Sequence, residues 1–430
     1  MCGRIESFNR PFDSQAIWQT GLSGPLHVVL FDSRSAGVPV CRQPSKTLTG
    51  SIATITLMSV RTNGLLLILI CTLCGNLMAQ ARNGISSDRE VSRQDEDSGT
   101  SIFPFPFVFY QPETKFGFGG TVITMFRMPS DGEQEQPSTF SPLLLYTQKR
   151  QLTAMAATEL YFGSGRHRMT AELGYSKFPN TMWGVGNDTP ESLEEDYTPR
   201  TVFASAQFQT RVTRGFFAGG RLSFAHRKLV ETDSVGLLVR AAVPGTEDSH
   251  VLTGALLLTW DTRDNTVYPT GGGYRQLTVA VNDSALGSDY SYATYTLDVR
   301  QYLTVFPGHV IALRGLGVTS TGTQPFDQMP QLGGEELVRG YYGGRYRDRN
   351  LMAYQAEYRA SIWGRIGAVG FVAAGRVSET LSDMNFTGMK PSAGLGLRIA
   401  LAPDEGLNLR ADFGFGRGSS GFYLGMGEVF

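Results

Sequence analysis

The chain has 430 residues, and its 38 basic and 39 acidic side chains leave a net charge of −1. A balance this close to neutral excludes a basic field over the whole protein, so we expect no nucleic-acid partner. The slightly negative mean hydropathy argues against a helical membrane protein. It does not argue against a membrane barrel, because strands that alternate apolar and polar residues escape such averages.

Cysteine and histidine are placed so that no metal or catalytic site is expected. All four cysteines lie before residue 75, so the rest of the chain has neither a disulfide framework nor a thiolate site. The five histidines show no HxxxH or HExxH spacing, and no GxSxG motif is present. We therefore expect no catalytic residue, no metal, no cofactor and no enzyme activity.

Residues 58–81 predict a signal peptide. Arg61 supplies its positive charge, residues 65–74 its apolar region, and residues 79–81 an A-x-A-like cleavage site. About ten apolar residues are too few to cross a ~30 Å hydrocarbon core as a helix. Because a signal peptide normally starts a chain, we interpret residues 1–57, which have no assigned fold, as an upstream extension that is not translated.

Residues 82–101 are polar and acidic, and we predict that they form a disordered periplasmic lead. This lead is too short for a periplasmic domain.

From residue 102 to residue 430 the dominant sequence period is two. Within residues 351–361, Tyr354 and Tyr358 share one face, whereas Glu357 and Arg359 share the other. This alternation predicts β-strands and does not fit a helix. A soluble β-sandwich or propeller would have charged outward faces, but here one face of the strands is consistently apolar. That pattern favours a barrel whose outer face meets lipid and whose inner face lines water or a plug.

The alternation defines about sixteen strands. They occupy residues 104–111, 115–127, 139–149, 151–162, 167–178, 201–212, 215–229, 250–262, 272–283, 290–303, 309–320, 351–361, 366–377, 390–401, 405–416 and 421–430. An even number of strands fits a closed antiparallel barrel. Residues 102–430 thus predict an all-β, closed antiparallel transmembrane barrel.

The length of each connection depends on whether the strand before it is odd-numbered or even-numbered. Long connections follow odd-numbered strands, at residues 179–200, 230–249, 321–350 and 378–389. Even-numbered strands are mostly followed by short turns, with residues 128–138 and 263–271 as exceptions. Short periplasmic turns and long extracellular loops are typical of outer-membrane proteins. We therefore expect a multi-pass protein of the bacterial outer membrane, in contact with its lipid.

The connection at residues 331–350, QLGGEELVRGYYGGRYRDRN, is too polar and too rich in glycine for a strand. Its glycines allow positive φ, so the segment can fold back on itself and place Arg339 beside tyrosine rings. The residues alone leave two alternatives open. The loop either docks inside the barrel or stays on the surface with Arg339 in solvent.

A set of segments runs through the barrel region in a fixed order. They are YQPET (110–114), WGVGND (183–188), WDTRDNTVYPTGGGY (260–274), LDVRQY (297–302), the VRGY-containing loop (331–350), YQAEYR (354–359), GFVAAGRV (370–377), LGLR (395–398) and LRADFGFG (409–416). Together they resemble the BamA/TamA-like bacterial surface antigen family of the barrel-assembly and two-partner secretion superfamily. The VRGY segment followed by QAEYR is the most specific part of this resemblance.

The resemblance implies a barrel of sixteen strands whose sixth extracellular loop folds into the lumen. The implied loop-lock residues are Val338, Arg339, Gly340, Tyr341 and Glu357. In the family, a second carboxylate comes from an FxDxG motif, but here Ala373 occupies the aspartate position. We therefore expect Arg339 to have Glu357 as its single partner and the lock to be weaker. Other charged residues that face the lumen by alternation are interpreted as wall structure: Asp298, Arg300, Arg398, Arg410 and Asp412.

The resemblance also implies a seam between the first and last strands that can open laterally. Its candidate residues are Phe105, Phe107, Phe422, Leu424 and Phe430.

Two classes of function remain open. The first is insertion or translocation of unfolded outer-membrane proteins by pairing between strand edges, with a separate periplasmic soluble partner that supplies substrate capture. The second is a plugged passive pore for small solutes, since sixteen strands enclose an aqueous channel. A purely structural role in the outer membrane is a further alternative.

Overall fold

The computed structural model describes residues 100–127, 138–240, 243–402 and 407–430. The extension at 1–57, the signal peptide at 58–81 and nearly all of the lead at 82–101 lie outside the described residues.

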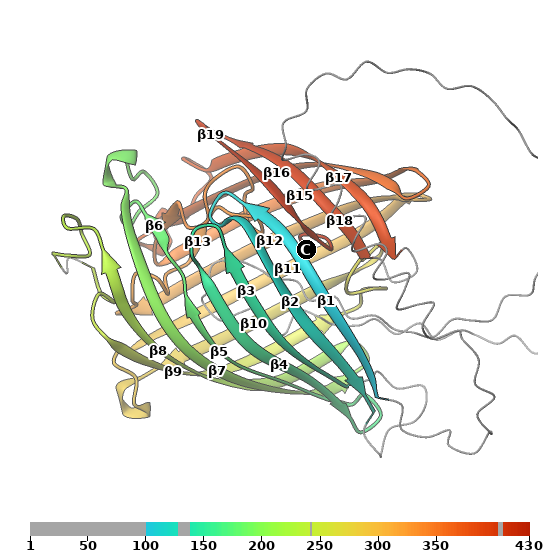
Figure 1. The fold of residues 1–430 in the computed structure, drawn as a ribbon, viewed down its shortest axis with the longest axis horizontal. Coiled ribbons are helices and arrows are strands. Elements are labelled where there is room, and N and C mark those ends of the chain that lie inside the picture. Colours follow the sequence, from blue (N-terminus) through green and yellow to red (C-terminus); the bar gives the residue numbers. More distant parts are fainter. Residues whose placement is uncertain (1–99, 128–137, 241–242, 403–406) are drawn as a thin grey trace, which may run out of the picture. The chain divides into compact units, whose positions relative to one another are not determined.

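Sixteen long strands form one antiparallel sheet that closes into a barrel (Figure 1). They are β1 (Ser101–Gln111), β2 (Lys115–Phe126), β3 (Ser138–Thr147), β4 (Leu152–Phe162), β5 (His167–Lys177), β7 (Glu195–Thr213), β8 (Phe216–Thr232), β9 (Ser249–Asp261), β10 (Gly272–Asn282), β11 (Tyr292–Phe306), β12 (His309–Gly322), β15 (Asn350–Trp363), β16 (Ile366–Ser378), β17 (Lys390–Ala402), β18 (Leu407–Gly416) and β19 (Ser419–Met426). Neighbouring strands pair in chain order, and β19 meets β1 to close the sheet. The predicted fold class is confirmed.

The remaining elements are short and lie in the connections. β6 (Asn180–Met182) pairs with β7, and β13 (Gln331–Leu332) pairs with β14 (Tyr346–Arg347) as a separate hairpin. The described helices are three single turns of 3-10 helix, Glu191–Leu193, Ser284–Leu286 and Leu381–Asp383. None of the helices in the described part of the chain is long and apolar enough to cross a membrane.

The long connections lie at one end of the barrel, which we call the long-loop end. The connections after β5, β8, β12 and β16 all lie there, since each follows a strand that runs in the same direction. The opposite, short-turn end carries tight reversals such as the one between β15 and β16. This arrangement follows from the antiparallel order of the strands.

The outer surface of the barrel is apolar where a soluble protein would be charged. Leu222, Leu256 and Leu395 project outward from β8, β9 and β17, and 66–73% of each is exposed. Their neighbours in sequence point inward, and buried polar side chains such as Gln209 and Thr259 line the lumen. An apolar surface this extensive is stable only against lipid.

A charge on the outer face should weaken the folded barrel. Leu256 lies in the middle of β9, paired with Gly220 and Val279, so we expect Leu256→Arg to cost about 2–4 kcal/mol in lipid. Guanidinium titration of the barrel in lipid vesicles measures this loss. Val235, which is 70% exposed on the connection after β8, provides the control. An equal loss in Val235→Arg would contradict a lipid-facing position for Leu256.

Candidate functional site

The connection between β12 and β15, residues 323–349, lies against the inner wall of the barrel. We call this connection the inner loop. Its two sides are joined as a hairpin by the pairing of β13 with β14, in which Gln331 lies opposite Arg347 and Leu332 opposite Tyr346. Gly186, in the connection after β5, donates its N–H to the Arg347 carbonyl at 2.8 Å. The inner loop is therefore fixed to the connection after β5 at the long-loop end.

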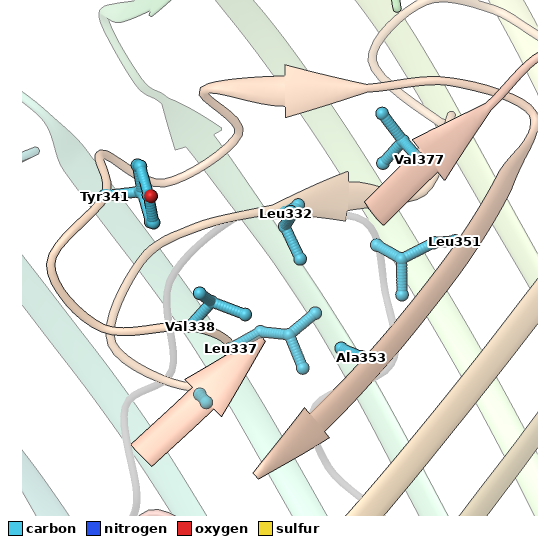
Figure 2. Packing of buried hydrophobic residues seen from close by; sticks show 8 residues of the cluster. Leu332, Leu337, Val338, Tyr341, Leu351, Ala353 and Val377 are labelled. Atoms are coloured by element: carbon cyan, nitrogen blue, oxygen red, sulfur yellow. The ribbon is translucent and has the colours of Figure 1, made fainter. Parts of the chain in front are cut away.

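An apolar cluster anchors the inner loop to β15 and β16. Its buried residues are Leu332, Leu337, Val338, Tyr341, Leu351, Ala353, Ala373 and Val377 (Figure 2). Small residues on β16 make room for the loop, since a Cβ on Gly375 would lie 2.3 Å from Leu332. Burial of each large aliphatic side chain contributes about 1.5–3 kcal/mol. Ala373, at the position where the family pattern has aspartate, is part of this apolar contact.

The backbone around Arg339 takes conformations that few residues tolerate. Val338 has a φ of 62°, which is a genuine outlier for a β-branched side chain. Gly340 has a φ of 111°, and a Cβ there would lie 2.7 Å from the backbone of Phe415 and Gly416 on β18. The close approach to β18 and the strain at Val338 together aim the Arg339 side chain at the adjacent wall.

The Arg339 guanidinium is buried and forms ion pairs with Glu357 on β15 and with Asp412 on β18. Its flat face lies 3.6 Å from the ring centre of Phe371 on β16. A planar guanidinium accommodates two carboxylates and an aromatic face at once. The sequence predicts Glu357 as the single partner, but the structure provides two. Asp412 takes the role that Ala373 cannot fill.

These two carboxylates belong to a larger buried network. Its members are Arg339, Arg359, Arg398 and Arg410 with Glu335, Glu357, Asp412 and Glu428. Arg359 donates to Glu357 at 2.9 Å, and Arg398 pairs with Glu428 at 3.0 Å. Four positive and four negative charges balance, as burial requires, because an unpaired buried charge is costly.

The inner loop also contacts the strands next to the seam. The Gly340 N–H donates to the Tyr423 hydroxyl at 3.0 Å, and the Ser419 hydroxyl donates to the Gly340 carbonyl at 2.7 Å. The Tyr341 hydroxyl donates to the Pro391 carbonyl of β17 at 3.0 Å. Tyr423 and Ser419 both belong to β19, the last strand of the barrel.

The seam between β1 and β19 is paired at a single position, Tyr110 opposite Leu424. The rings of Tyr110 and Phe422 lie 5.6 Å apart across it. Phe105 and Phe107 belong to a buried cluster on the lumen side, together with Met426 of β19. The structure thus places four of the five candidate seam residues beside the junction.

Phe430, the fifth candidate, does not lie at the seam. Gly427, with a φ of 73°, turns the chain away from β1. Phe430 then packs in a buried cluster with Tyr302 of β11 and Val310 of β12. The expectation for this residue was wrong because a strand pattern in the sequence does not show where the chain bends inward.

Sequence context offered no reason to expect three of the residues that hold the inner loop. Glu335 bonds to the wall from within the loop, Tyr423 contacts the loop backbone, and Phe371 stacks on Arg339. Asp412, predicted as wall structure, is a direct partner of Arg339. Alternation shows that Asp412 and Phe371 face the lumen, but it cannot show which lumen residue each one meets.

Of the other charged residues predicted as wall structure, Arg410 pairs with Glu335 of the inner loop, whereas Asp298 and Arg300 pair with each other on β11. Asp298 accepts hydrogen bonds from Arg300 at 2.6 Å and from Arg314 at 2.9 Å. Within the described ranges, no group of three or more His, Cys, Asp or Glu side chains is arranged to hold a metal ion.

Comparison with protein families finds the Omp85 superfamily domain over residues 139–430. The chain belongs to the Omp85 superfamily. It is therefore an outer-membrane β-barrel of the assembly and translocation superfamily. No curated protein matches the chain.

Solved structures share the fold of this Omp85 barrel at low sequence identity. BamA from Haemophilus ducreyi lacking POTRA domains 1–3 is 14% identical, with a TM-score of 0.56 over 76% of this chain and 70% of that one. CdiB from Acinetobacter baumannii is 12% identical, with a TM-score of 0.51 over 76% of this chain and 65% of that one. CdiB from Escherichia coli is 10% identical, with a TM-score of 0.52 over 77% and 68%.

Removing the carboxylates around Arg339 should release the inner loop. Glu357→Gln or Asp412→Asn leaves one carboxylate, and the double variant leaves the buried guanidinium with neither, at a cost of about 3–5 kcal/mol. Trypsin measures the release, since it cleaves after arginine and the inner loop holds four. We expect slow cleavage in each single variant and fast cleavage in the double variant. Asp383→Asn, on the connection after β16, controls for loss of charge, and full protection in the double variant would contradict the lock.

Proposed function

We propose that this Omp85 barrel inserts or translocates polypeptides at the outer membrane through the seam between β1 and β19. One observation carries the proposal: the seam has a single paired position. Every other junction between neighbouring barrel strands has at least eight. Because each backbone hydrogen bond contributes about 0.5–1.5 kcal/mol net, this junction opens at far lower cost than any other.

An opened seam provides what an unfolded barrel protein needs. Its strands expose unpaired N–H and C=O groups along their edges, and such edges bind an extended chain by adding it to the sheet. In the lipid phase, an incoming strand gains most from this pairing because its own backbone groups have no water to bind. We propose unfolded outer-membrane proteins as the substrates, with a periplasmic soluble partner that delivers them.

A disulfide across the seam tests this function. Tyr110→Cys together with Leu424→Cys joins the one paired position, and the described barrel has no native cysteine to interfere. We expect the oxidised variant in lipid vesicles to lose its ability to speed the folding of a urea-denatured outer-membrane protein. Reduction should restore this activity. Folding is followed by the shift of the substrate on unheated gels.

A second disulfide, placed away from the seam, controls for the general effect of cross-linking two strands of the barrel. Leu395→Cys with Phe413→Cys joins two paired residues of β17 and β18, far along the sheet from the opening. This variant should keep full activity when oxidised. Equal activity of the seam disulfide before and after reduction would contradict lateral opening.

The polar lumen favours a plugged pore as the second candidate. Charged side chains line β11 to β18, and the inner loop lies among them. Deletion of residues 331–350 should then raise single-channel conductance in planar bilayers severalfold. A barrel that speeds folding and shows no rise in conductance after this deletion supports the insertion function over the pore.

A further inference from the structure

The seam lacks backbone pairing for a reason that lies in β1. Pro104 and Pro106 pair with Val122 and Gly120 in an unbroken ladder that joins β1 to β2. Along an antiparallel strand, successive residues bond alternately to the two neighbouring strands. Proline has no N–H to donate to a neighbouring strand. Because the ladder with β2 is continuous, the backbone groups of the even-numbered β1 residues, which include both prolines, must point toward the seam. The seam edge of β1 therefore lacks two of its donors.

The last strand does not supply a partner for this part of β1. If the pairing of Tyr110 with Leu424 continued in register, Pro106 would lie opposite Glu428. Glu428 instead turns into the lumen and accepts hydrogen bonds from Arg398 at 3.0 Å and from Asn408 at 2.9 Å. Backbone pairing at the seam is thus absent at the prolines, and it is already absent at Val108, the residue between Pro106 and the paired region.

The inner loop contacts the strands on both sides of this poorly paired junction. One carboxylate oxygen of Glu335 accepts from Gln111 at the end of β1, and the other accepts from Arg410 on β18. Glu335, Gln111 and Arg410 are all buried. A single side chain of the loop therefore joins the first strand to the last pair of strands.

A second pair of contacts repeats this bridge. The Gly343 N–H donates to Glu113 in the turn between β1 and β2, while the Gly340 N–H donates to the Tyr423 hydroxyl of β19. Burial raises the pKa of Glu113, and the hydrogen bond from Gly343 opposes that rise. Gly340 and Gly343 of the inner loop thus connect the turn between β1 and β2 to β19.

We propose that the inner loop is a clasp that holds the seam closed from inside, with Glu335 as the residue that joins its two sides. Opening then requires Glu335 to release Gln111, Arg410 or both. The Arg339 lock ties the loop to β15 and β18, whereas the clasp adds the contact with β1. The two meet where Arg410 lies 3.6 Å from Asp412. The clasp would regulate the seam on which the proposed function rests.

Glu335→Gln tests the clasp, with Glu336→Gln as its matched control. Both substitutions remove one loop carboxylate, which is buried at Glu335 and half-buried at Glu336, but the Glu336 carboxylate faces Arg314 and Arg300, on β12 and β11, away from the seam. Spin labels at Tyr110→Cys and Leu424→Cys report the distance across the seam in the full chain in lipid vesicles. The four native cysteines are replaced by serine for this measurement.

We expect Glu335→Gln to produce a second population of seam distances, longer by at least ~5 Å, which is one strand spacing. Glu336→Gln should keep the parent distribution. Trypsin protection of the inner loop should persist in Glu335→Gln, because the Arg339 lock is intact. An unchanged seam distance in Glu335→Gln, or an equal change in Glu336→Gln, would overturn the clasp.

Gln111→Leu keeps the proposal testable if Glu335→Gln does not fold. It removes the β1 side of the bridge and leaves the pair of Glu335 with Arg410 in place. The same longer distance is expected, and its absence would count against the clasp. Because the measurement uses no substrate, a seam that opens in these variants without speeding substrate folding would reject the proposed function and leave the clasp standing.

Discussion

The guanidinium of Arg339 is buried in the lumen, where an unpaired charge costs several kcal/mol. Two carboxylates from strands on opposite sides of β16 and β17 meet that cost, and Phe371 covers the remaining face of the group. This requirement fixes the path of the inner loop, because the chain must deliver the arginine to one point of the wall. The positive φ at Val338 and the contact of Gly340 with β18 are local consequences of it.

The barrel is closed in two physically different ways. Fifteen junctions are closed by ladders of backbone hydrogen bonds, which in lipid are costly to break because no water replaces them. The sixteenth has one paired position and relies on side chains of the inner loop, which bond from the lumen side. The prolines of β1 contribute to this difference, since they remove donors from its edge and leave the β2 ladder whole. A seam closed by side chains responds to changes inside the lumen, whereas one closed by a full ladder does not.

Sequence reasoning recovered the elements whose causes are local. Alternation of period two gave the strands and their inward faces, and the length of the connections gave the long-loop end. Glu357 was predictable because the family resemblance implies it as the partner of Arg339, and alternation places it on the polar face of the strand that follows the loop. Asp412 was not, since it is 73 positions away and one lumen charge cannot be told from another by pattern. The inward turn at Gly427 misled the expectation for Phe430, because glycine permits a turn without requiring one.

The sequence by itself determined that this chain forms an outer-membrane barrel of sixteen strands with a special loop before the twelfth. It could do so because strand period and glycine content act within a few residues. Only the tertiary structure decided that Arg339 has two partners and that Glu335 joins Gln111 to Arg410, across 224 and 75 positions of chain. Those contacts exist because closure of the barrel brings the first and last strands together, and no local pattern records which side chains then meet.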